Sequence, residues 1–236
     1  LAEAGLGAVL PEDEAVGAQI VARFPGTDTG APLDTIPDLT LTLDPHVIDP
    51  VRARALAQAG ARHLPVTLRE VSVRVGPLFE PDRPVCHDCL DLWEADADAC
   101  WPAIATQARL LPEPVLERLL LHQCAALAVR AALDCLGDAP DRWRAASTEL
   151  SADEPLGVER RWSPHPRCLC SQTSRAAGTA GAPRAPRASR SAGASRTDPR
   201  AAGRPAASGV DIAVVAPATP RAPARSAAAG PRTPGA

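Results

Sequence analysis

The sequence contains no lysine, methionine or tyrosine, and aromatic residues make up only 3% of it. Every fixed cation is therefore an arginine, a bias typical of GC-rich coding. No basic segment followed by a long apolar run opens the chain, so we predict no signal peptide. The most apolar stretch, residues 115–136, is interrupted by Glu117, Arg118, His122 and Arg130, which favours a buried helix over a membrane span. These absences indicate a cytoplasmic protein without a membrane partner.

The spacing of the cysteines gives the clearest indication of a functional site. Four of the seven cysteines form two close pairs, Cys86-x-x-Cys89 and Cys168-x-Cys170. Two such pairs match a closed tetrahedral zinc site, and in a reducing compartment thiols bind metal more often than they form disulfides. A redox C-x-x-C is the alternative, but it leaves the second pair unexplained. His87 or His165 could replace one thiol, because both lie inside the two motifs.

Charge divides the chain into two parts. Residues 171–236 hold ten arginines against two acidic residues, whereas the overall charge is −3, so residues 1–170 are acidic. The second part is rich in Ala, Pro, Gly, Ser and Arg, a composition that buries too little apolar surface to offset chain entropy. We predict a folded domain over 1–170 and a disordered tail over 171–236. In that tail the run 210–215 is apolar enough for a strand but too isolated to be stable.

The tail allows two interpretations. It could be an out-of-frame translation of GC-rich DNA, or a genuine basic linker that attracts nucleic acid. The arginines are spaced evenly among Ala and Pro, and no aromatic residue accompanies them. We therefore expect no nucleic-acid partner.

Periodicity predicts an α/β domain. Alternating apolar residues predict a strand at 38–43, and Asp49-Pro50 marks the start of a helix that ends at Gly60. The order strand, helix, strand indicates a right-handed βαβ unit. The remaining expected elements are strands at 63–68, 71–75, 148–150 and 157–162 and a long helix at 114–136.

For the other candidate glycines, cysteines and acidic residues, we predict structural roles and not functional ones. Gly5 and Gly7 do not form a G-x-G-x-x-G turn, because no strand precedes them. Cys124 and Cys135 fall on the apolar helix and are expected to be small buried residues. The acidic residues of 91–98 could form a carboxylate pair for acid–base work, but no His or Ser in the stretch partners them. We expect a solvated acidic bend there and assign no catalytic residue.

Several motifs together resemble one family. They are His63-Leu64-Pro65-Val66, Val75-Gly76-Pro77-Leu78, Cys86-x-x-Cys89-Leu90-Asp91-Leu92, Trp101-Pro102 and His165-Pro166-Arg167-Cys168-Leu169-Cys170. Residues 1–170 thus resemble the ThiF-like partner proteins of thiazole/oxazole-modified peptide biosynthesis, often called TOMM leader-peptide-binding proteins.

The resemblance implies a doubly wound, ubiquitin-activating-like α/β fold with structural zinc on Cys86, Cys89, Cys168 and Cys170. It implies a non-catalytic protein that binds the leader of a ribosomal precursor peptide. Its partner would be a YcaO-type cyclodehydratase, which uses ATP to cyclise Cys, Ser or Thr. Proteins of this fold commonly form homodimers.

The chain departs from the family at its start. It begins at Leu1, which resembles the part just after the family's Gly-rich turn, so we interpret it as N-terminally incomplete. Glu12, Asp13 and Glu14 match the ribose-binding acid by position only, and we expect no ATP binding. The missing first strand should leave apolar edges exposed beside Leu39, Leu41 and Leu43. A ThiF-type adenylyltransferase and an inactive gene fragment are the alternatives.

Overall fold

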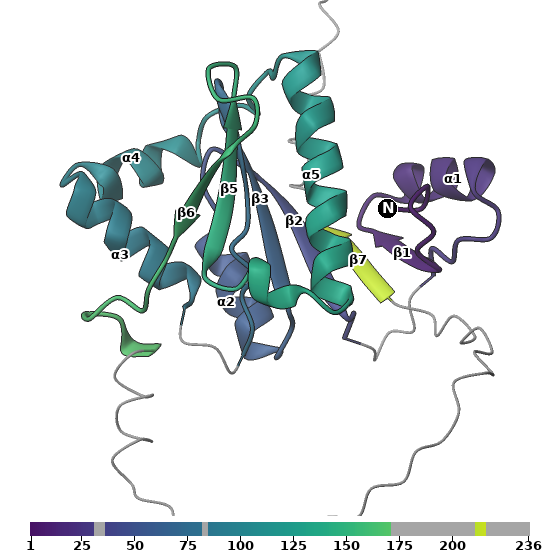
Figure 1. Ribbon diagram of the computed structural model, residues 1–236, viewed down its shortest axis with the longest axis horizontal. Helices are drawn as coiled ribbons and strands as arrows, with labels where there is room; N and C mark the ends of the chain where they lie inside the picture. Colours follow the sequence, from purple (N-terminus) through teal and green to yellow (C-terminus); the bar gives the residue numbers. More distant parts are fainter. Residues whose placement is uncertain (31–35, 82–84, 171–210, 216–236) are drawn as a thin grey trace, which may run out of the picture.

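The computed structural model describes residues 1–30, 36–81, 85–170 and the backbone of 211–215. Its centre is a seven-stranded mixed sheet in the order β1-β7-β2-β3-β4-β5-β6 (Figure 1). The strands are β1 (Ala8–Pro11), β2 (Leu39–Pro45), β3 (His63–Leu68), β4 (Ser72–Val75), β5 (Ala146–Ser151), β6 (Val158–Arg161) and β7 (Asp211–Val215).

The sheet has a parallel and an antiparallel half. The strands β1, β7, β2 and β3 run parallel, and β4, β5 and β6 continue the sheet in antiparallel fashion. The helix α2 (Pro50–Gln58) makes the crossover from β2 to β3, which is the predicted βαβ unit. Its start is also as predicted, because the Asp49 side chain caps the helix and Pro50 occupies its first turn. The observed architecture is a mixed α/β fold.

The long helix α5 (Arg118–Leu136) covers one face of the sheet. It packs on β2, β4 and β5, and its buried side chains join the alternate strand residues Leu39, Leu41, Leu64, Val66, Val73 and Val75 in the main core. By length and composition α5 could cross a membrane, with a mean hydropathy of 1.5. Its packing on the sheet is that of a core helix, and it starts four residues later than we predicted.

The intervening residues of β2 point to the opposite face, because successive strand side chains alternate. A second core lies between α2, α3 (His87–Ala97) and the segment after β6, and it includes Ile48, Phe79, Leu90 and Trp162. The short helix α4 (Trp101–Ala108) packs beside α3. The main core and this second core thus lie on opposite faces of the sheet.

Two predictions about the sheet are wrong. The segment Asp211–Val215, expected to be part of the disordered tail, is a strand in the parallel half, between β1 and β2. As a result the expected apolar edge is covered: Leu39 is 0% exposed and Leu41 is 4% exposed. A strand too weak to form alone is stable there because it has a partner on each side. The predicted disorder at 171–210 and 216–236 lies outside the described residues.

The acidic stretch 91–98 is also not a solvated bend. Asp91, Glu94 and Asp96 lie on α3, and Glu94 accepts hydrogen bonds from Arg74 at 2.9 Å and Arg160 at 3.0 Å. Arg74 is almost fully buried, so Glu94 supplies the carboxylate that its guanidinium needs. These pairs join α3 to β4 and β6.

The β5–β6 turn gives a stability prediction. Gly157 has a φ of 83°, and a Cβ there would lie 2.7 Å from Thr148 Cγ2. Gly157→Ala should lower the free energy of unfolding by about 1–2 kcal/mol through the backbone and by about 1–3 kcal/mol more through crowding. Chemical denaturation measures the change.

The matched control is Gly60→Ala. Gly60 has a φ of 73°, but its added Cβ would meet nothing within 4 Å. The control should therefore lose only the backbone part. Equal losses in the two variants would contradict the crowding at Thr148.

Candidate metal centre

The two cysteine pairs meet in space. The Sγ atoms of Cys86, Cys89, Cys168 and Cys170 all lie within 4.8 Å of one another. Three of the separations are 3.8 Å for Cys86–Cys89, 3.6 Å for Cys86–Cys168 and 3.2 Å for Cys89–Cys170. Zn–S bonds of about 2.3 Å in a tetrahedron require S···S edges of about 3.8 Å. The cluster can therefore hold a metal ion such as zinc.

The fold delivers the pairs from two distant segments. Cys86 is the N-cap residue of α3 and makes no side-chain capping bond, and Cys89 lies in the first helical turn. Cys168 and Cys170 follow β6, where the Cys168 amide donates to the His165 carbonyl at 2.9 Å. Because a helix N-terminus carries partial positive charge, the start of α3 favours thiolates at this position.

Side chains around the cluster hold the second pair against α3. His165 is fully buried, its Nε2 lies 2.8 Å from Asp96 Oδ2, and its backbone amide donates to Cys89 Sγ at 3.3 Å. Arg167 also donates to Asp96, and the Trp93 indole donates to the Ser163 carbonyl at 2.8 Å. Neither His165 nor His87 belongs to the cluster, so the alternative of a histidine ligand finds no support.

The chemistry of the donors fits a cation. Burial raises the pKa of the Cys86 thiol to about 12 and raises the pKa of Cys170 as well, whereas burial of the Cys89 sulfur is outweighed by the hydrogen bonds to it, which lower its pKa. Burying several thiolates together without a counter-charge is unfavourable, whereas a divalent metal displaces their protons and neutralises them. No disulfide joins any of the seven cysteines, all of which are described.

The other cysteines lie apart from the cluster. Cys124 and Cys135 are buried on α5, as predicted, and burial raises their pKa values to about 11 and about 12. Cys100 is exposed at the start of α4. These three thiols provide controls for any test of the cluster.

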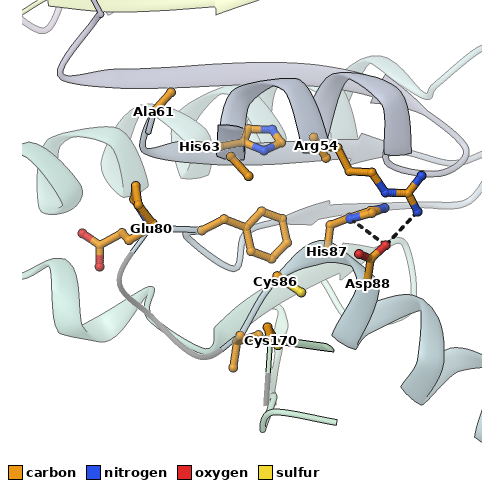
Figure 2. A pocket seen from close by; sticks show the side chains of 13 residues that line it. Arg54, Ala61, His63, Glu80, Cys86, His87, Asp88 and Cys170 are labelled. Carbon is orange, nitrogen blue, oxygen red and sulfur yellow. Dashed lines mark hydrogen bonds and ion pairs between the residues drawn. The ribbon is translucent and has the colours of Figure 1, made fainter. Parts of the chain in front are cut away.

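A cavity of about 170 Å³ opens beside the cluster. Figure 2 shows it between α2, the start of β3 and the start of α3, with Cys86 and Cys170 in its wall. Arg54 and Asp88 close one side through an ion pair of 2.9 Å. His63 and Glu80 add polar groups.

His63 belongs to a buried hydrogen-bond network that we did not predict from the sequence. The Thr42 hydroxyl donates to Asp44 Oδ2 at 2.5 Å and lies 2.8 Å from His63 Nε2. A hydroxyl has one proton, so with that proton directed to Asp44 the His63 Nε2 acts as the donor to Thr42. Burial, with His87 and Arg52 nearby, lowers the pKa of His63 to about 3. The alternation of polar residues in Thr40-Leu41-Thr42-Leu43-Asp44 was the available signal.

Comparison with solved structures places the fold. Escherichia coli MccB in complex with the peptide MccA has a TM-score of 0.53 at 13% identity, over 72% of this chain and 60% of that chain. The MccB complex with ATP has a TM-score of 0.50 at 13% identity, with the same coverage. The E. coli microcin synthetase McbBCD complex has a TM-score of 0.48 at 13% identity, over 69% of this chain and 67% of that chain.

These comparisons show the fold and nothing finer. The chain shares the fold of MccB and spans between 49% and 61% of the MccB chains that it matches. No protein-family model matches the sequence. No curated protein matches it either.

The metal prediction uses paired substitutions. The purified chain should carry one metal ion, and Cys86→Ser/Cys168→Ser should abolish binding, because two of four ligands are lost. Cys100→Ser and Cys124→Ser should retain full occupancy. Elemental analysis after dialysis measures the stoichiometry, and metal retained in the double variant would exclude this site.

The His63 network predicts an acid dependence of stability. The pKa of His63 is about 3 in the folded chain, against 6.5 ordinarily, so the unfolded chain binds the extra proton between these values. Stability from neutral His63 is present above pH 6.5 and falls as the pH drops toward 3, by about 1.4 kcal/mol per pH unit. His63→Gln should flatten the dependence by this amount, whereas His122→Gln, on the exposed side of α5, should not. Equal slopes from denaturation at several pH values would refute the assignment.

Proposed function

We propose that this chain is a non-catalytic scaffold in the biosynthesis of thiazole/oxazole-modified peptides. It binds the leader of a ribosomal precursor peptide and partners a YcaO-type cyclodehydratase in the cytoplasm. Two lines support the proposal: the motifs around the four cysteines, and the fold shared with MccB, which has been solved in complex with the peptide MccA. The scaffold would work as a homodimer or alone.

In this proposal the metal is zinc and its role is structural. Four thiolates are the donor set of closed zinc sites, which leave no open position for a substrate. The ion would tie the start of α3 to residues 168–170. Cys86, Cys89, Cys168 and Cys170 are the proposed ligands.

The N-terminus of the helix after β1 is occupied by a side chain and offers no free amides to a phosphate. In α1 (Glu14–Arg23) the Asp13 side chain accepts from the amides of Ala15 at 2.7 Å and Val16 at 3.4 Å. Adenylation needs such amides free for phosphates, together with positive charge. Here Glu12, Asp13 and Glu14, the acids that match the family's ribose-binding position, stand at the junction, and it offers no phosphate cradle.

The N-terminus of α2, the second described helix that follows a parallel strand, is also capped by an aspartate side chain. Asp49 accepts from the amides of Val51 at 2.8 Å and Arg52 at 3.4 Å at the start of α2. Neither junction is a phosphate cradle. Adenylyltransferase activity remains the second candidate only because the MccB complex with ATP shares the fold.

The connection between α4 and α5 is the surface we assign to the partner enzyme. Val115 is 93% exposed, and the neighbouring large apolar residues Ile104, Leu110, Leu111 and Leu119 are exposed as well. A run of exposed apolar residues so close in sequence is typical of a protein interaction site. It lies at one end of α5, away from β7 (Figure 1).

The test combines the chain with a YcaO-type enzyme and a precursor peptide encoded beside its gene. The chain should bind the leader, raise the rate of azoline formation and show no ATP–pyrophosphate exchange by itself. Val115→Asp should weaken binding of the enzyme by about tenfold without lowering thermal stability, since an exposed charge costs the fold little.

The control is Leu156→Asp, in the β5–β6 turn, where Leu156 is 95% exposed. This variant should retain enzyme binding. Robust pyrophosphate exchange by the chain would favour the adenylyltransferase. A folded chain that binds neither peptide nor enzyme would leave the inactive fragment as the better interpretation.

A further inference from the structure

The strand β7 joins the N-terminal unit to the rest of the sheet. Its register pairs Ala8–Pro11 of β1 with Asp211–Val214 on one side, and Leu39–Thr42 of β2 with Ile212–Val215 on the other. Among the described strands, β1 pairs with no strand but β7. Removing β7 would therefore leave one edge of β2 and one edge of β1 without hydrogen-bond partners.

With β7 in place, those edges are buried. On β2, Leu39 and Thr42 are 0% exposed and Thr40 is 2% exposed. Backbone groups at such buried positions need partners, and each unpaired group costs about 1–3 kcal/mol. In the folded chain one strand, parallel to both neighbours, fills the space between β1 and β2 and pairs with these groups.

The occupant comes from far along the chain. Forty residues, 171–210, separate Cys170 from β7. A chain of that length can reach about 130 Å when extended, far more than the five strand spacings of about 4.8 Å from β6 to β7. Nothing in the local chain geometry therefore fixes β7 in its place, and main-chain pairing is what holds it.

We propose that the space between β1 and β2 is a strand-binding site and that Asp211–Val215 is its tethered ligand. The ligand class is an extended peptide, rich in β-branched residues, that inserts in parallel and is recognised mainly through its backbone. The sequence Asp211-Ile212-Ala213-Val214-Val215 has this composition. The inference does not depend on the proposed function.

The tether decides which strand occupies the site. A linked segment competes at an effective concentration on the order of millimolar, so a free peptide at micromolar concentration cannot displace it. Binding in trans should become visible only when the chain's own strand is disabled. A strand-binding site is therefore recognised by a peptide that binds a variant with a disabled β7 but not the wild-type chain.

The experiment uses the full chain with Ala213→Pro. Every residue of a central strand donates its amide to one neighbour, and proline removes that donor. The variant should melt about 5–10 °C lower than wild type and lose about tenfold of its hydrogen-exchange protection at 39–42. Ala207→Pro, the same change outside β7, should leave both unchanged.

A synthetic peptide of residues 209–217 then supplies the strand in trans. At about 100 µM it should restore the melting temperature and the protection of Ala213→Pro. The same peptide with proline at position 213 should restore neither. The wild-type chain should bind the labelled peptide at least about tenfold more weakly than the variant does.

Each outcome decides the proposal. Identical melting temperatures for Ala213→Pro and Ala207→Pro, or no rescue by the peptide, would overturn it. If Ala213→Pro is insoluble, refolding in the presence of each peptide replaces the melting experiment. Recovery with the wild-type peptide alone supports the strand-binding site, and equal recovery with both peptides refutes it.

Discussion

The meeting of two cysteine pairs is the contact on which the described α/β domain depends most. Cys86 and Cys168 are 82 residues apart in sequence, yet their sulfurs lie 3.6 Å apart. Closing a chain segment of this length costs about 4 kcal/mol in entropy, whereas structural zinc can contribute about 10–16 kcal/mol of apparent binding energy in small peptides. A metal at this point would hold α3 and the segment after β6 together. In the sequence, β5 and β6 of the antiparallel half lie between these two segments.

The parallel half depends on a different constraint, the pairing of a central strand. The main core under α5 includes Leu39 and Leu41 of β2, and their burial goes with β7 being in place. The two halves thus use different means to join distant segments. The antiparallel half uses side chains that can share one cation, and the parallel half uses backbone hydrogen bonds. Both means gather segments that no local contact would bring together.

This difference explains what the sequence could predict. The Asp49-Pro50 start of α2 and the alternation in β2 are local signals, and both were interpreted correctly. The cysteine pairs were recognised because metal binding needs particular residues at particular spacings. The position of β7 was missed because strand pairing is non-local: the composition of 210–215 permits a strand but does not identify its neighbours. The contact of His63 with Thr42 was missed for the same reason.

X-ray absorption spectroscopy at the zinc edge identifies the atoms that surround the bound ion. The account predicts that the purified chain holds zinc with four sulfur neighbours at about 2.3 Å and no nitrogen or oxygen ligand in the first shell. A mixed sulfur and nitrogen shell would mean that a histidine replaces one of the four cysteines. Absence of a zinc edge, with the four cysteines reacting with thiol reagents only after reduction, would show disulfides in place of a metal centre and would contradict the zinc site.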